Sequence, residues 1–242
     1  MENDQEGFFD ERAAAFHDTV RQRRDTPETV AFLEPLARGG PVLELAIGAG
    51  RVALPLAARG ITVDGIDISE AMVARLRAKQ GGDQLDVTIG DFAAVAVSGL
   101  YRLVFVVANS LCNLGTQDDQ VRCFENVAAH LTDDGSFVVD GFIPDAAWLR
   151  DGQYIEAEAV GVEHVMLDVG RIDAVTQLLE ETHVVLSQGG VQLYPVVTRY
   201  VWPSELDLMA RIAGLRLRER WAGWSREPFT AASNAYVSVY GH

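Results

Sequence analysis

Apolar positions follow two alternating patterns through the middle of the chain. Between Pro41 and Ile143, short continuous apolar runs alternate with stretches whose apolar residues recur every three to four positions. The runs predict strands covered on both faces, and the stretches between them predict helices. The expected strands are 42–47, 61–66, 85–89, 103–108 and 137–139. Strands that alternate with helices predict βαβ units and a parallel sheet.

The first 40 residues predict two helices. An apolar stripe at three-to-four spacing marks the first one and consists of Phe8, Phe9, Ala13, Phe16 and Val20. The second is expected to begin at Thr26-Pro27-Glu28 and to end before Gly39-Gly40. We expect the threonine to cap this helix, the proline to lie in its first turn, and the acid to lie near the positive end of the helix dipole.

The part of the chain after Ile143 departs from the alternation. Residues 144–202 are rich in valine, threonine and tyrosine and carry a hairpin signal at Ser187–Gly190, which predicts an inserted antiparallel sheet. Residues 203–242 predict a closing helix and two strands, 215–221 and 235–240. We therefore expect one domain over 1–242, with N-terminal helices in 1–40, a doubly wound core in 41–143, a β lid in 144–202 and closing elements in 203–242.

Charge and composition restrict the kind of partner. The chain has 35 acidic and 20 basic side chains, a net charge of −15, whereas nucleic acids and anionic membranes require a basic surface. Neither an apolar run of membrane-spanning length nor a signal peptide is visible. The five histidines are scattered without ligand spacing, so no metal site is expected. These features predict a cytoplasmic protein, a monomer or homodimer, with a small-molecule partner.

A glycine-rich turn follows the first expected strand, in the segment Glu44-Leu45-Ala46-Ile47-Gly48-Ala49-Gly50-Arg51. Glycines at such a turn let a ligand approach the backbone closely. Ligands of open α/β sheets bind beyond the carboxyl ends of the strands. Asp67 ends the next expected strand, where an acid can accept hydrogen bonds from both ribose hydroxyls. The turn and Asp67 together favour a cofactor that contains a nucleoside.

Two classes of cofactor fit this turn. The segment 48–53 satisfies the dinucleotide pattern G-x-G-x-x-A, so an NAD(P)-dependent oxidoreductase is one alternative. Two features argue against it: the extra carboxylate of Glu44 inside the strand, and the pair Asp91-Phe92 after the third expected strand. An acid and an aromatic ring at that place can bind the amino group of adenine and stack on its ring. A non-catalytic protein that binds the cofactor is a further alternative.

These motifs resemble those of the class I S-adenosylmethionine-dependent methyltransferases. The family's first motif, acid-x-Gly-x-Gly-x-Gly, looks like Glu44 to Gly50 with Ala46 in place of the first glycine, and the loop after its fourth strand looks like 108–111. The resemblance implies a seven-stranded, mostly parallel Rossmann-like sheet with an antiparallel last strand, and S-adenosylmethionine as cofactor. The implied cofactor contacts are Phe16, Glu44, Ala46, Gly48, Gly50, Arg51, Asp67, Ile68, Met72, Asp91, Phe92 and Asn109.

The resemblance also implies methyl transfer to a nitrogen or oxygen atom of a small metabolite, with natural-product biosynthesis as one setting. Within the family the chain resembles bacterial enzymes with a β-rich lid, including amino-sugar N-methyltransferases, whose N-terminal aromatic residues close over the cofactor. An ammonium or alcohol acceptor must lose a proton. The catalytic candidates, all on the expected lid, are His183, Arg199 and Tyr200. Each has a structural alternative: a sheet-face histidine, a surface partner of Glu181 and a packing aromatic, respectively.

Overall fold

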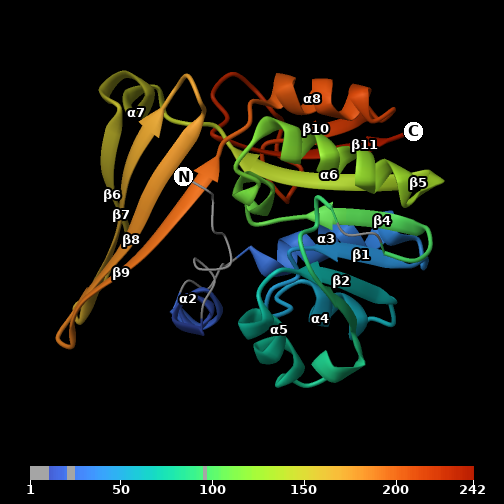
Figure 1. The fold of residues 1–242 in the computed structure, drawn as a ribbon, viewed down its shortest axis with the longest axis horizontal. Coiled ribbons are helices and arrows are strands. Elements are labelled where there is room, and N and C mark those ends of the chain that lie inside the picture. Colours follow the sequence, from blue (N-terminus) through green and yellow to red (C-terminus); the bar gives the residue numbers. More distant parts are fainter. Residues whose placement is uncertain (1–10, 21–24, 95–96) are drawn as a thin grey trace.

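The computed structural model describes residues 11–20, 25–94 and 97–242, and these residues form two sheets (Figure 1). One is a seven-stranded sheet in the order β10-β11-β5-β4-β1-β2-β3, and the other is a four-stranded sheet that stands beside its carboxyl edge. Phe142, at the end of β5, leads directly into the second sheet through a short helix. None of the helices over the described residues is long and apolar enough to cross a membrane.

The seven-stranded sheet confirms the predicted Rossmann-like core. Strands β1 to β5 run parallel, β11 pairs antiparallel with β5, and β10 pairs antiparallel with β11. The strand bounds are Val42–Leu45 (β1), Val63–Asp67 (β2), Asp86–Ile89 (β3), Tyr101–Val106 (β4), Leu131–Phe142 (β5), Arg216–Trp221 (β10) and Ala235–Gly241 (β11). β5 begins six residues earlier than 137, the start expected from its apolar run, because its first part pairs with Tyr101 despite its polar residues.

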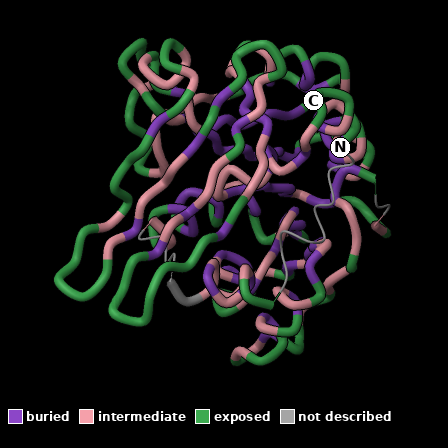
Figure 2. The backbone as a smooth tube through the Cα atoms, turned by 60° about the vertical axis from the view of Figure 1, so that its left-hand side comes forward, coloured by how far each residue is buried: buried purple, intermediate pink, exposed green. Residues whose placement is uncertain are grey.

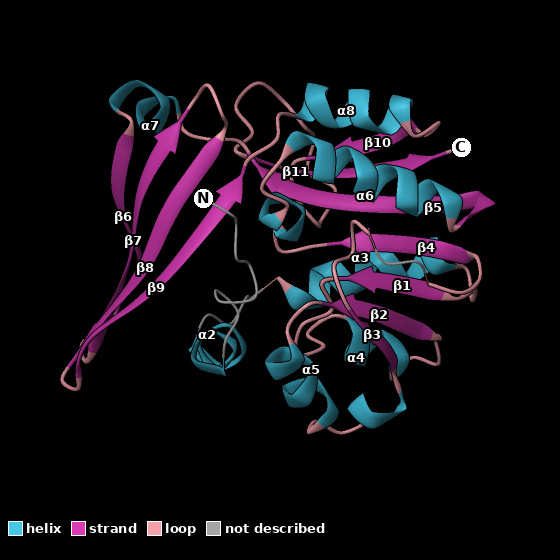
Figure 3. Cartoon of the chain, in the orientation of Figure 1, coloured by secondary structure: helices cyan, strands magenta, loops and turns pink. Residues whose placement is uncertain are grey.

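Helices cover both faces of this sheet, as a doubly wound fold requires. They are α3 (Thr26–Ala37), α4 (Ala53–Ala57), α5 (Glu70–Arg77), α6 (Gln117–Ala129) and α8 (Pro203–Ile212), with short 3₁₀ turns at Gly82–Gln84 and Ser110–Asn113. A hydrophobic core lies on each face of the sheet, because successive side chains of a strand point to opposite faces. Val104 and Val106 of β4 pack with α6 and α8, whereas Leu103 and Phe105 pack with α3 and α4. Figure 3 shows α6 and α8 together on one side of the sheet.

Side-chain caps explain where two of the core helices begin. Ser69 accepts a hydrogen bond from the backbone of Met72 at the start of α5, and Thr116 does the same for Asp119 at the start of α6. The cap predicted for α3 was wrong, because Asp25 occupies the N-cap position and Thr26 is the first helical residue. Pro27 still lies in the first turn, where its missing N–H costs nothing.

The second sheet is the predicted lid. Its strands β6 (Gln153–Val160), β7 (His164–Asp173), β8 (Leu178–Ser187) and β9 (Gly190–Arg199) form an antiparallel meander, and the predicted hairpin closes where Ser187 pairs with Gly190. Figure 2 shows that the hairpin ends far from the core are exposed, whereas the buried residues of the lid lie closer to the core. The helix α7 (Ala146–Asp151), begun by an Asp145 cap, was missed because six residues are too few to show helical periodicity.

The N-terminal segment lies between the lid and the core (Figure 1). It consists of α2 (Glu11–Ala15) and a π-helical turn, η1 (Phe16–Val20). Ion pairs of 2.5 Å join Glu11 to Arg75 and Asp18 to Lys79, which fasten the segment to α5 and the loop after it. On the other side, the ring of Phe16 stacks on Tyr194 of β9 with 4.0 Å between centroids. The segment therefore bridges both halves of the molecule.

Candidate active site

A cavity of about 800 Å³ lies at the carboxyl edge of the parallel sheet. The core supplies one wall, with Glu44 of β1, Gly48 of the loop after it and Asp67 at the end of β2. His17 and Asp18 of the N-terminal segment close one side, and the inner face of the lid closes the rest. This is where open α/β sheets bind ligands, because the loops that follow successive parallel strands converge there.

The loop after β1 is shaped by backbone in the left-handed region. Ala46, Gly48 and Gly50 have φ values of 55°, 56° and 77°. The N–H of Gly48 donates a 2.7 Å hydrogen bond to Oδ2 of Asp67, and the N–H of Ser69 donates a 2.8 Å bond to Oδ1. Burial raises the pKa of Asp67, and these two backbone donors oppose the rise. The Asp67 carboxylate is thus held in one position at the cavity wall.

Glu44 is the most deeply buried acid that lines the cavity, with 3% of its surface exposed. Its Oε2 atom has no hydrogen-bond partner among the described residues. Burial raises its pKa from 4.5 to about 8, although the nearby Arg51 guanidinium opposes that rise. A buried carboxyl oxygen without a hydrogen-bond partner is costly unless a ligand supplies one. Glu44 therefore marks a place for a positively charged or hydrogen-bond-donating ligand group.

The loop after β4 is fixed from the neighbouring strand. Ala108 and Asn109 have φ values of 64° and 61°, and both donate backbone hydrogen bonds, of 3.0 and 2.9 Å, to the carboxylate of Asp140 on β5. The sequence reasoning missed Asp140, a buried acid within an apolar strand. By holding this strained turn, it places Asn109 at the cavity wall.

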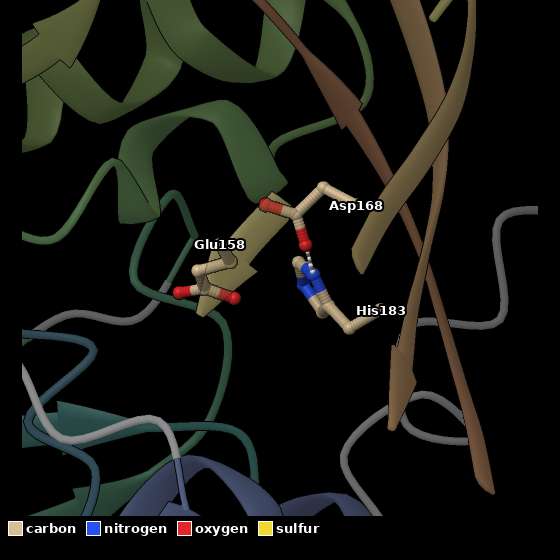
Figure 4. A group of neighbouring side chains, drawn as sticks. All are labelled: Glu158, Asp168 and His183. Carbon is tan, nitrogen blue, oxygen red and sulfur yellow. Dashed lines mark hydrogen bonds and ion pairs between the residues drawn. The ribbon is translucent and has the colours of Figure 1, made fainter. Parts of the chain in front are cut away.

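The lid carries a cluster of three polar side chains, shown in Figure 4, and two of them, Asp168 and His183, line the same cavity. Asp168 of β7 lies opposite His183 of β8, and Nδ1 of His183 is 2.6 Å from Oδ1 of Asp168. Together with Glu158 of β6, their ligand atoms lie within 4.8 Å of one another, close enough for a cation. Spacing along the chain did not indicate this cluster, because strand pairing assembles it from residues 10 and 15 positions apart. The prediction of no metal site rested on spacing along the chain and stays a prediction.

The comparisons with known proteins agree with this geometry. Residues 42–135 match a family profile described as a methyltransferase domain. The chain is 27% identical over 208 residues to the cypemycin N-terminal methyltransferase of a Streptomyces species, covering 83% of this chain and 82% of that protein. The structure of the CcbJ methyltransferase from Streptomyces caelestis superposes with a TM-score of 0.91 at 36% identity, covering 98% of both chains.

The chain belongs to the S-adenosylmethionine-dependent methyltransferases. Its cofactor is S-adenosylmethionine and its activity is methyl transfer, so the oxidoreductase alternative is not supported. The S-adenosylmethionine-bound amino pentose methyltransferase CalS10 from Micromonospora echinaspora has the same fold at 18% identity, with a TM-score of 0.68 over 90% of this chain and 92% of that one.

Most of the cofactor contacts implied by the resemblance line the cavity of the methyltransferase. They are Glu44, Ala46, Gly48, Arg51, Asp67, Ile68, Met72, Phe92 and Asn109. Three others lie outside its lining. Phe16 packs against the lid instead, Gly50 faces the core, and Asp91 accepts a 2.8 Å hydrogen bond from the backbone of Ala93. In the structure these three residues take part in packing or in a turn. Their positions in the motifs could not distinguish such a role from a contact with the ligand.

Two of the three predicted catalytic residues are also placed elsewhere. Arg199 is buried and bonds to Oε1 of Gln120 and of Glu205 at 2.6 Å each, so it fastens the end of β9 to α6 and α8. It is neither at the cavity nor a surface partner of Glu181. Tyr200 is 1% exposed and packs edge-on against Trp202. Only His183 lines the cavity, as a residue that is 2% exposed.

Gly50 packs against the core and Gly48 lines the cavity, so substitutions at the two positions are expected to have different effects. A Cβ atom on Gly50 would lie 2.3 Å from a methyl of Leu76, whereas one on Gly48 would lie 3.0 Å from the flexible end of Met72. Gly50→Ala is therefore expected to lower the melting temperature markedly. Gly48→Ala should fold with a smaller loss and weaken cofactor binding, since its Cβ points into the cavity wall. Thermal unfolding and calorimetry measure both effects. Equal melting temperatures for the two variants would contradict this assignment.

The N-terminal segment is expected to protect the cofactor from solvent. His17 and Asp18 line the cavity and lie between it and the rest of the N-terminal segment. The predicted aromatic flap rests here on Phe16, since Phe8 and Phe9 lie outside the described residues. Hydrogen exchange of residues 11–18 should be fast in the free protein and slowed by S-adenosylmethionine, because a flap belongs to the least stable part of a fold. Equal protection in both states would identify a fixed structural helix.

Proposed function

We propose that this methyltransferase methylates a nitrogen or oxygen atom of a small metabolite enclosed between core and lid, with natural-product biosynthesis as its setting. The observation that carries the proposal is the cavity of about 800 Å³, which is lined jointly by the cofactor loop, the N-terminal segment and the lid. That volume is within the range of small-molecule sites, which is ~300–1,000 Å³. The names of its relatives agree: one modifies an amino pentose and another the N-terminus of cypemycin.

The residues of the core would hold the cofactor by complementary groups. Asp67 accepts hydrogen bonds from the ribose hydroxyls, Glu44 receives the methionyl ammonium, and Phe92 packs against adenine. Two observations support this assignment of residues to parts of the cofactor. The Asp67 carboxylate has a fixed orientation, and Oε2 of Glu44 has no hydrogen-bond partner among the described residues. Bound S-adenosylmethionine supplies an electrophilic methyl group. The chain itself must orient the acceptor and exclude water, and orientation alone can lower such a barrier by ~7–11 kcal/mol.

His183 is the proposed proton acceptor. Asp168 lies 2.6 Å from its Nδ1 atom, which fixes the tautomer and orientation of the imidazole. The same carboxylate stabilises the imidazolium that forms when the ring takes a proton from the acceptor. The neighbouring Glu181, whose Oε1 is 3.3 Å from Nδ1, adds to that stabilisation.

The cellular setting and assembly of the enzyme are also part of the proposal. We propose a cytoplasmic monomer or homodimer in which residues 1–242 act as one domain. The net charge of −15 supports a partner other than nucleic acid.

A thermal-shift panel with S-adenosylmethionine, S-adenosylhomocysteine, NAD and NADP tests the cofactor assignment. A ligand that binds only the native state raises the melting temperature by mass action. The first two ligands should stabilise the protein and the nicotinamide cofactors should not. Stabilisation by NAD or NADP alone would contradict the proposal. Release of S-adenosylhomocysteine on addition of small amines and alcohols then tests the acceptor class.

A further inference from the structure

The face of the lid that points away from the cavity is apolar, whereas the solvent face of an antiparallel sheet is commonly polar. The inner face is identified by its contacts, because Met166, Val185 and Tyr194 pack around Phe16 of the N-terminal segment. Successive side chains of a strand point to opposite faces, so the residues that flank these three lie on the outer face. Valine, leucine and proline occupy all of the flanking positions.

Strand pairing arranges the outer residues in three rows, each of which crosses all four strands of the lid. Of the twelve residues in these rows, none is charged and only Thr182 is polar. Ile155 and Val160 of β6, and Val191 and Leu193 of β9, are more than half exposed. We call this surface the outer lid face. Its three rows are Ile155, Val169, Thr182 and Pro195; Ala157, Leu167, Val184 and Leu193; and Val160, Val165, Leu186 and Val191.

Polar groups border the outer lid face at both ends of its strands. Towards the core, Arg171 and Glu180 lie opposite each other on β7 and β8 and form an ion pair of 2.7 Å. At the far end, β8 and β9 close in the polar turn Ser187–Gly190. An apolar centre surrounded by a polar rim is the arrangement that protein–protein interfaces show.

The edges of the lid are less suited to a partner than its face. A partner strand needs a regular row of N–H and C=O groups along an edge. Pro195 interrupts this row in the edge strand β9, because proline has no N–H. In the other edge strand, β6, a bulge between Ala157 and Ala159 interrupts the regular pairing. We therefore expect a partner to pack on the outer lid face and not to extend the sheet.

The dimensions of the outer lid face suit a partner as broad as a sheet. Strands lie ~4.8 Å apart and residues on one face of a strand follow every ~6.8 Å, so three rows over four strands cover roughly 20 by 20 Å. A single helix is only ~10–12 Å wide and would leave about half of that width in water. A stable interface buries ~800 Å² per partner, so a partner must cover the full width of the face and its rim.

The charge of the chain favours a second copy over a membrane. The net charge of −15 repels anionic lipid headgroups. Between two copies the same charge acts over the whole molecule and is screened by salt, whereas the outer lid face itself is uncharged. Two copies related by a twofold axis present the same face to each other, which is the commonest symmetry of soluble oligomers. Sheets packed face to face interdigitate their side chains.

We propose that two copies of this methyltransferase form a dimer in which their outer lid faces pack against each other. The inference decides between the monomer and the homodimer proposed above. It rests on none of the chemistry assigned to the cavity. In the dimer each lid lies between its own core, across the cavity, and the lid of the second copy.

Sedimentation velocity of the full chain over ~1–100 μM measures the assembly. We expect a species with twice the 26.4 kDa mass of one chain. Its dissociation constant should be ~10 μM or lower and should not rise at high salt, because the contact is apolar and salt screens the repulsion between the copies. A monomer over the whole range, or a dimer that salt dissociates, would overturn the proposal.

Two variants locate the contact on the lid. Leu193→Glu and Ile155→Glu place a charge on opposite edge strands, where the side chains are 53% and 72% exposed and the fold does not depend on them. Each should weaken the dimer at least ~10-fold and leave the affinity for S-adenosylhomocysteine unchanged. Leu208→Glu is the matched control, because Leu208 lies on α8 with 56% exposure, and it should dimerise normally. A dimer that survives both lid variants, or that the control dissociates equally, would refute this interface.

Two further measurements separate the alternatives. Vesicles of neutral phosphatidylcholine should not co-sediment with the protein. Co-sedimentation that Leu193→Glu abolishes would assign the outer lid face to lipid and overturn the dimer. Calorimetry with S-adenosylhomocysteine tests the proposed function independently. Failure to bind it refutes that function and leaves the dimer standing, whereas a monomer that binds it refutes the dimer alone.

Discussion

Replacing Asp67 with alanine is expected to weaken S-adenosylhomocysteine binding at least ~10-fold. The proposed contacts are two charge-assisted hydrogen bonds from the ribose hydroxyls, each worth ~1.5–3 kcal/mol. The substitution also removes the acceptor of the Gly48 and Ser69 backbone donors, so part of the loss comes from a loosened cofactor loop. Isothermal titration calorimetry measures the affinity, and circular dichroism verifies the fold.

Two further variants separate these contributions. Asp67→Asn keeps the size of the side chain and one acceptor oxygen, and should lose less affinity than the alanine variant. Asp64→Asn is a control on the same strand, because Asp64 accepts a 2.9 Å hydrogen bond from the Tyr101 hydroxyl and does not line the cavity. It should bind normally. Full affinity in Asp67→Ala would remove Asp67 from the cofactor site.

Cofactor binding is expected to release a proton from Glu44. Burial raises the pKa of this residue to about 8, so the free protein holds it protonated at pH 7. An ammonium group bound at Oε2 favours the ionised form, so binding expels the proton and the apparent affinity rises with pH up to about 8. Calorimetry at pH 7 in buffers of different ionisation enthalpy measures the release. Glu44→Gln should bind more weakly and release no proton.

The same residue is expected to affect stability in a defined direction. Its folded-state pKa lies above the ordinary value of 4.5, so the native protein holds the proton more tightly than the unfolded chain between pH 4.5 and about 8. The Glu44 contribution to the free energy of unfolding therefore falls as pH rises through that window. Denaturant unfolding of the cofactor-free proteins measures this free energy at pH 5 and pH 8. Its decline between the two pH values should be smaller for Glu44→Gln than for the unchanged protein. A parallel decline in both proteins would show that Glu44 does not titrate there.

The amino-acid sequence determined the core and the cofactor half of the site. Buried parallel strands appear as continuous apolar runs, and the glycine turn after β1 is a local feature, so neither needs knowledge of distant contacts. Glu44, Gly48 and Asp67 lie at or just beyond the carboxyl ends of two neighbouring parallel strands, and parallel strands bring these ends to one edge of the sheet. Their convergence on the cavity was therefore predictable.

Only the tertiary structure decided the acceptor half. The lid consists of antiparallel strands, in which a register change of one residue turns a side chain to the opposite face. The sequence could not show that His183 faces the cavity or that Arg199 instead joins Gln120 and Glu205 beneath the lid. Nor could it show that Asp168 lies beside His183, since a pairing across 15 residues depends on the packing of the whole lid. Strand pairing between distant segments, which the local pattern does not encode, determined the chemistry of this half.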